Sequence, residues 1–281
     1  ASVTGRKGEI MKKALGMDYN DFESGSMAFD YETMMKSTGF TLEEIERVQA
    51  LTGVGNTSML TLRNLTALAR KCAKPGYGAT ICAKDEQANP SGSFKARRAA
   101  CALAFAKKHG YKGVIAATSG NYGAAVASQA AMQGLKCIIV QEAYDSKEIG
   151  QPEIIEKARA CEAMGAEVVQ LTVGPELFYE ALSLLEDTEY FNASLYSPFG
   201  IAGIETLGYE IAIQCREMFG KDPDMVVCTT AGGGMVTGTA RGLKKAGAKD
   251  TKIVGASIDL TGLHMASDTQ FNKKSCTTGH T

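Results

Sequence analysis

The sequence predicts an α/β protein in which helices cover both faces of parallel β-sheets. Short apolar runs rich in β-branched residues recur along the chain, and longer stretches with helical periodicity separate them. Most of these helical stretches end in glycine, the usual residue just after a helix C-terminus. Near-continuous apolar strands that alternate with helices are typical of parallel sheets buried on both faces.

The expected elements follow one another in a regular order. Residues 30–53 are expected to be helical, with TLEE at 41–44 as an N-terminal capping box, and the loop GVGNTSML follows at 53–60. Strands are expected at 79–84, 113–118, 136–141, 167–173, 224–230 and 252–258. Helices are expected at 94–110, 122–134, 151–165, 175–187, 203–220 and 235–247.

Length and composition restrict the class of protein. The chain has 281 residues, of which 44% are hydrophobic and 22% charged, which favours one two-lobed unit or two small domains. The formal net charge of −1 gives no electrostatic reason to expect nucleic acid or an anionic membrane surface as a partner. No window approaches the roughly 20 apolar residues of a membrane span, and the start lacks an apolar signal core, so a cytoplasmic location is expected.

Neither the cysteines nor the histidines are arranged as a metal site. The cysteines are scattered without a CxxC pair and are expected to be buried free thiols: Cys72, Cys82, Cys101, Cys137, Cys161, Cys215, Cys228 and Cys276. The histidines share no ligand spacing: His109, His264 and His280. The chain opens without methionine and stops on TTGHT, so we expect it to be a piece of a longer protein.

The first loop with unusual composition is NPSGSFKARRAA at 89–100, which places Lys95 where a helix begins. An ammonium group there faces the positive end of the helix dipole, so its pKa should fall and the neutral amine is favoured. A neutral amine attacks aldehydes, which makes a Schiff base feasible. The alternative is an exposed lysine in a surface loop.

The second loop is ATSGNYGAA at 117–125, directly after an expected strand. Thr118, Ser119 and Asn121, together with backbone N–H groups at a helix start, suit a small anion such as a substrate carboxylate. The alternative is an ordinary helix cap by Ser119 or Asn121.

The third loop is TTAGGGMVTGTA at 229–240, in which consecutive glycines lie between an expected strand and a helix. Their backbone amides could close around a phosphate, and the lack of Gly-Lys-Ser/Thr argues against a nucleotide-triphosphate loop. A rival interpretation takes Gly232, Gly234, Gly238 and Asp259 as a dinucleotide site of a nicotinamide-dependent oxidoreductase. This rival leaves the first two loops unexplained.

Taken together and in this order, the three loops resemble the pyridoxal-phosphate enzymes of the tryptophan synthase β-subunit type, known as fold type II. NPSGSFKARRA is similar to the family's lysine segment, TSGNYG to its Ser-Gly-Asn loop, and AGGGMVTG to its glycine phosphate loop. GVGNTSML and IAGIETLGYEI are similar to two further family segments. The resemblance runs from about residue 52 to 258.

The resemblance implies pyridoxal 5'-phosphate as cofactor, with Lys95 as the catalytic lysine that holds it and shuttles a proton, and Phe94 beside the ring. It implies that Asn121 bonds the ring hydroxyl and that Thr118, Ser119 and Asn121 bind the carboxylate of an amino acid substrate. The residues implied to bind the cofactor phosphate are Ala231, Gly232, Gly233, Gly234 and Met235. It also implies a homodimer and two domains, a larger one from 1–95 and 201–281 and a smaller one from 96–200.

The chain departs from the family pattern at several positions. Ala96 stands where the family often has Asp after the lysine, and Ser58 and Met59 replace Pro-Leu. The Ser or Thr that usually faces the pyridine nitrogen has no counterpart that we can place, and we expect it beyond Thr281.

Within the family, SFKARRA, residues 142–169 and SCTTGHT resemble members that cleave 2-amino-4-oxopentanoate with coenzyme A in ornithine breakdown. This implies alanine and acetyl-CoA as products and a small α subunit as partner. The alternative within the family is β-elimination or replacement, as in ammonia-lyases and threonine-synthase-like enzymes. A catalytically inactive assembly subunit is disfavoured because Lys95 and Asn121 are both present.

Overall fold

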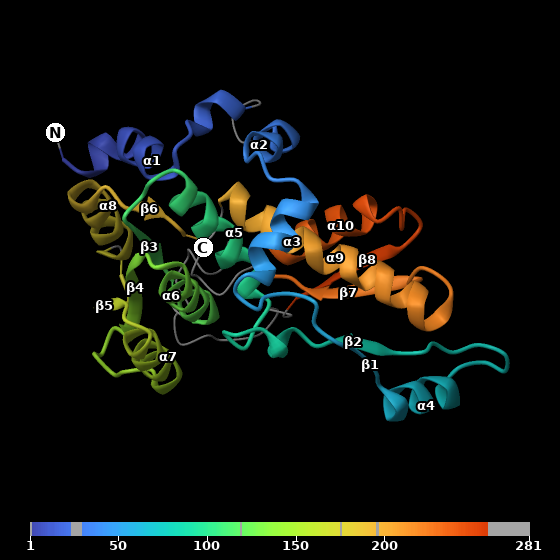
Figure 1. The fold of residues 1–281 in the computed structure, drawn as a ribbon. Coiled ribbons are helices and arrows are strands. Elements are labelled where there is room, and N and C mark those ends of the chain that lie inside the picture. The colour runs from blue at the N-terminus through green and yellow to red at the C-terminus, as the bar shows by residue number, and fades with distance from the viewer. Residues whose placement is uncertain (1, 24–29, 119, 175, 195–196, 258–281) are drawn as a thin grey trace.

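The computed structural model describes residues 2–23, 30–118, 120–174, 176–194 and 197–257. Within them the chain forms a four-stranded sheet, a two-stranded sheet and a short strand pair, with helices packed around them (Figure 1). All pairs in the first two sheets are parallel, so the predicted α/β class is confirmed. No helix in this described part is long and apolar enough to cross a membrane.

The four-stranded parallel sheet has the strand order β5-β4-β3-β6. Its strands are β3 (Gly113–Ala117), β4 (Lys136–Tyr144), β5 (Glu167–Thr172) and β6 (Phe191–Asn192). The first three confirm the strands predicted at 113–118, 136–141 and 167–173. No sequence signal marks β6, because two residues are too few to establish a periodicity.

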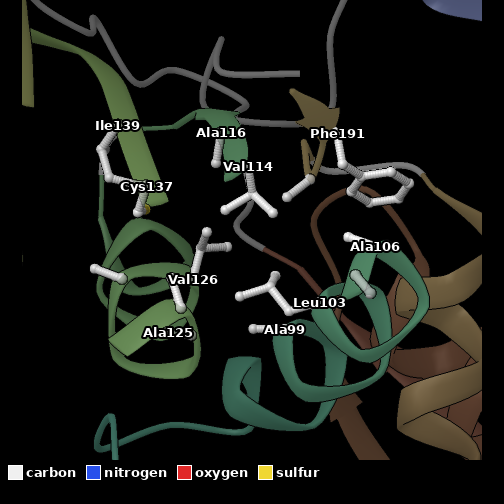
Figure 2. Close-up of a cluster of buried hydrophobic side chains, with 14 of the residues drawn as sticks. Ala99, Leu103, Ala106, Val114, Ala116, Ala125, Val126, Cys137, Ile139 and Phe191 are labelled. Carbon is white, nitrogen blue, oxygen red and sulfur yellow. The ribbon is translucent and has the colours of Figure 1, made fainter. Parts of the chain in front are cut away.

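Helices cover both faces of this sheet, as its apolar strands predict. One face carries α5 (Lys95–Lys108), α6 (Asn121–Gln133) and α7 (Pro152–Ala163); the other carries α1 (Lys7–Leu15) and α8 (Glu176–Thr188). Successive residues of β3 point to opposite faces. Val114 and Ala116 therefore pack with Leu103 of α5 and Val126 of α6 (Figure 2), whereas Ile115 packs on the other side.

The second parallel sheet pairs β7 (Met225–Thr229) with β8 (Lys252–Ala256). Its helices are α9 (Pro198–Phe219) and α10 (Gly234–Lys245), which cross very closely. A Cβ on Gly208 would overlap the carbonyl oxygen of Thr239, and one on Gly242 would overlap that of Glu205. Glycine at these positions therefore brings α10, and the loop before it, against α9.

The N-terminal third differs from the sequence expectation in two respects. The strand predicted at 79–84 is only β2 (Cys82–Lys84), and it pairs antiparallel with β1 (Met59–Thr61), so it is not part of a parallel sheet. Residues 30–53 form two helices, α2 (Tyr31–Ser37) and α3 (Leu42–Ala50), with Gly39 at a φ of 65° between them. The predicted capping box is confirmed at the start of α3.

The remaining elements are short. They are α4 (Arg63–Cys72), η1 (Thr4–Arg6), η2 (Tyr19–Phe22) and η3 (Glu86–Ala88). Of the cysteines, those at 101, 137, 161, 215 and 228 are free and buried, as predicted. Cys72 is free but exposed and Cys82 is only partly buried, so the predicted burial is wrong for these two cysteines. Cys276 lies outside the described residues. The division into two domains stays a prediction.

Candidate active site

Lys95 is the first residue of α5, and its side chain is largely withdrawn from solvent. The Nζ atom lies 4.6 Å from the centroid of the Phe94 ring. Burial, with a smaller contribution from the charge of Arg98, lowers the pKa of Lys95 from 10.5 to about 8. The lowered pKa predicted from the sequence is therefore supported, but desolvation is its main cause rather than the helix dipole alone.

Arg97, two residues further along α5, anchors the start of this helix. Its guanidinium is fully buried and bonds the carboxylates of Glu86, at 2.7 and 2.9 Å, and Glu210, at 2.7 and 2.8 Å. Burial alone would raise the pKa of Glu210, but Arg97 and then Lys84 lower it to about 2. This ion network connects α9 with the segment before α5 and so fixes the backbone that carries Lys95.

The loop at 53–60 joins the same network. The N–H of Gly55 donates to Asn89 Oδ1 at 3.0 Å, and the hydroxyl of Thr57 donates to Glu86 at 2.6 Å. The segment GVGNTSML, which the sequence marks only through a family resemblance, thus holds the Asn-Pro loop that leads to Lys95.

The second predicted loop lies between β3 and α6. The Thr118 N–H donates to Val140 O at 2.8 Å, and the Thr118 side chain is buried. Asn121 is exposed at the first position of α6, and the N-cap is Gly120, at a φ of 140°, with no side-chain cap. Asn121 therefore does not cap this helix. Ser119, the other predicted cap, lies outside the described residues.

The third predicted loop runs from β7 into α10. Gly233, at a φ of 82°, is the N-cap of α10 and no side chain caps this helix. Ala231 and Gly232 are exposed, while Gly234 and Met235 are partly buried in its first turn. The loop therefore presents uncapped backbone N–H groups at a helix start, which is the usual site for a phosphate.

Two contacts bring these loops to the start of α5. Phe94 and Met235 pack against the same buried cluster, formed mainly by side chains of α9, which brings the glycine loop near the residue before Lys95. Arg98 stacks on Tyr122, with Cζ 4.5 Å from the ring centroid, which brings the start of α6 to the first turn of α5.

This arrangement fits pyridoxal phosphate. It offers an amine with a lowered pKa, an uncapped glycine turn for a phosphate and an exposed amide, Asn121, at a third helix start. One glycine of the rival dinucleotide pattern has another use, because a Cβ on Gly238 would lie 2.5 Å from Ile204 Cβ. Gly238 is thus required by helix packing, and Asp259 lies outside the described residues.

Sequence reasoning missed the parts played by Arg97, Arg98 and Tyr122. The only signal was the adjacent pair of arginines at the start of an alanine-rich helix. Burial of both guanidinium groups emerges only from the packing of α5 against α6 and α9.

Comparison with known proteins gives the following matches. A family model described as "Pyridoxal-phosphate dependent enzyme" matches residues 50–274. The 2-amino-4-ketopentanoate thiolase beta subunit of Acetoanaerobium sticklandii is 73% identical over 281 residues. A protein of the same name from an unknown prokaryotic organism is 66% identical over 280 residues. Both alignments cover the whole of this chain. They cover only 60% and 59% of the two relatives, so the chain spans about three fifths of their length.

A solved structure, that of a threonine deaminase from T.th., matches with a TM-score of 0.63 and 30% identity. The match covers 77% of this chain and 64% of that one.

Proposed function

Because the chain belongs to the pyridoxal-phosphate dependent enzyme family and has its fold type II architecture, we propose that it cleaves 2-amino-4-ketopentanoate with coenzyme A. The products would be alanine and acetyl-CoA. The observation that carries this choice is the 73% identity, over the whole chain, to a protein named 2-amino-4-ketopentanoate thiolase beta subunit.

The bound cofactor would supply an electron sink that stabilises negative charge next to the substrate nitrogen. Lys95 would hold the cofactor covalently, with Phe94 beside the ring and Asn121 at its hydroxyl. The backbone N–H groups from Ala231 through Gly232, Gly233 and Gly234 to Met235 would bind its phosphate, favoured by the dipole of α10.

The amino acid substrate would bind with its carboxylate at the start of α6. Thr118, Ser119 and Asn121 and the amides around them supply the donors for an anion there. With the substrate bound, the Lys95 amine would take the Cα proton. A pKa of about 8 supports this role, because a far larger share of the amine is then neutral near pH 7 than at the ordinary value of 10.5.

The thiol of coenzyme A would attack the 4-keto carbonyl and the C–C bond between C3 and C4 would break. The acetyl group would leave on the thiol sulfur, and the remaining three-carbon unit would take up at C3 the proton that the thiol loses. Return of the proton from Lys95 to Cα would then complete alanine. The name "beta subunit" of the relatives supports a partner subunit, which we propose to be a small α subunit. We further propose a homodimer of this chain in the cytoplasm.

Two assays test the proposal on the full-length protein with its partner subunit. Borohydride reduction followed by peptide mapping should place a pyridoxyl group on Lys95. Incubation with 2-amino-4-ketopentanoate and coenzyme A should consume thiol and form acetyl-CoA and alanine. The 30% identity to threonine deaminase favours elimination as the second candidate, and ammonia release from serine or threonine without thiol consumption would establish it instead.

A further inference from the structure

Arg98 is a buried arginine with unused donors. Its side chain is on α5, one turn after Lys95, and the residue is 3% exposed. Nε and Nη2 are buried and have no hydrogen-bond partner. One face of the guanidinium stacks on Tyr122. A buried charge with unsatisfied N–H groups is strongly unfavourable, so an acceptor that the described part of the chain does not provide is expected here.

The neighbouring Arg97 shows what such an acceptor would be. Nε and Nη2 lie on the same edge of a guanidinium and point their N–H groups in parallel. In Arg97 this edge is filled by the two carboxylate oxygens of Glu86, at 2.7 and 2.9 Å. In Arg98 the same edge is the one that has no partner.

The groups around this edge also favour an anion. Gly200, in the first turn of α9, faces it so closely that a Cβ would lie 3.1 Å from Nε and 3.4 Å from Nη2. The first turn of α9 has no side-chain cap, and the hydroxyl of Ser197, its N-cap residue, is buried without a partner. The guanidinium edge of Arg98 thus faces the first turn of a helix whose positive end has no side-chain cap and whose N-cap hydroxyl has no partner.

We propose that Arg98, Ser197 and the first turn of α9 bind the carboxylate of a small organic acid. A carboxylate matches the guanidinium edge, because its two oxygens have the spacing of the two parallel N–H groups. The glycine loop before α10 already offers a separate place for a phosphate. The site lies beside Lys95, whose pKa Arg98 helps to lower, so the bound acid would offset that charge and make the amine more basic.

The site is tested by thermal unfolding of the full-length protein in an acetate titration at constant ionic strength, with chloride as the balancing anion. Acetate should raise the melting temperature saturably, since a ligand that binds only the folded state stabilises it. In Arg98→Met this stabilisation should be lost. Without acetate, this variant should melt no lower than the unsubstituted protein, because it no longer buries an unpaired charge.

Gly200→Ala provides a second variant that keeps the charge. Its methyl group would lie against the two nitrogens, so acetate affinity should fall about tenfold or more, as expected when a hydrogen bond to a charged group is lost. Arg159→Met, which removes an exposed arginine of α7, is the matched control and should titrate like the unsubstituted protein. The absence of a saturable effect of acetate, or its persistence in both Arg98→Met and Gly200→Ala, would overturn the proposal.

The source of the carboxylate is resolved by kinetics under the same conditions. If the site holds the carboxylate of the amino acid substrate, acetate should raise KM and leave kcat unchanged. If it holds a separate acid, acetate should change kcat at a constant KM. The unfolding titration needs no turnover, so a failure of this site is distinguishable from a failure of the proposed reaction.

Discussion

Arg97, whose side chain is fully buried at the start of the helix that carries Lys95, donates from Nε and Nη2 to both carboxylate oxygens of Glu86, at 2.7 and 2.9 Å. Glu210, from α9, accepts from the same guanidinium. The ion pairs that fix the start of this helix, and with it Lys95, therefore join the loop before α5 to a helix more than 100 residues later in the chain.

Replacing Arg97 by Met should destabilise the protein strongly. It removes the cation from the largely buried carboxylate of Glu86 and leaves Glu210 with Lys84 alone. Breaking a buried pair in this way costs about 3–5 kcal/mol. Urea unfolding of the full-length protein measures the effect. Arg63→Met, at an exposed position of α4, is the control and should change the free energy of unfolding by about 0.5 kcal/mol or less. Equal midpoints for the two variants would contradict a role for the network in stability.

The same network should make the protein sensitive to acid. Burial opposes ionisation of Glu210, but Arg97 and Lys84 outweigh it and lower its pKa to about 2, below the value of 4.5 expected in the unfolded chain. The unfolded state then binds more protons between these values, so the stability that Glu210 contributes is present above pH 4.5 and lost as the pH falls toward 2.

Urea midpoints measured across this pH range test the prediction. Glu210→Gln should be less stable at neutral pH and should lose part of the pH dependence. Glu156→Gln, at an exposed site on α7, should retain the full dependence. A Glu210→Gln protein with an unchanged acid slope would contradict the assigned pKa.

The reactivity of Lys95 should follow its lowered pKa. Only the neutral amine attacks the cofactor aldehyde, so the rate at which the cofactor-free protein takes up pyridoxal phosphate should reach half its maximum near pH 8 and level off above that pH. A lysine of ordinary pKa would keep gaining rate to about pH 10.4. Arg98→Met should move the plateau upward, because it removes a neighbouring positive charge. Stopped-flow absorbance measures the rate, and a plateau at the ordinary value in the unsubstituted protein would refute the prediction.

Much of this fold could be predicted because its strands and helices carry local signals. The strands β3, β4 and β5 are apolar runs, and Thr41 with Glu44 forms the capping box that its sequence predicts. The strand β6 could not be predicted, because it consists of two residues and forms only by pairing with β3, which is distant in the sequence. The antiparallel pairing of β2 with β1 likewise depends on a contact that no periodicity encodes.

The candidate site shows the same division. Lys95, Asn121 and Gly233 lie where a loop enters a helix, and turn residues mark such places in a sequence. The state of Arg98 could not be predicted, since a charged residue in an alanine-rich helix is normally exposed. Its burial depends on Tyr122 and Gly200, which belong to two other helices.

The glycine loop gives the sharpest test of the cofactor site. Gly233 has a φ of 82° and nothing within 4 Å of a would-be Cβ, so alanine there meets only backbone strain of about 1–2 kcal/mol. Relief of this strain would turn the amides of the loop away from a bound phosphate. Gly233→Ala should therefore weaken pyridoxal phosphate binding about tenfold, measured by absorbance titration of the cofactor-free protein.

Gly134→Ala is the matched control for this prediction. Gly134 has a φ of 73° and also has nothing within 4 Å of a would-be Cβ. It is the C-cap of α6, at the opposite end of that helix from Asn121. Its replacement should lower the melting temperature by a similar or larger amount, because the strain is the same in kind, and leave cofactor affinity unchanged. If both variants bind the cofactor equally well, the turn at Gly233 does not hold its phosphate; if both bind it equally poorly, strain acts through global stability and not through the loop.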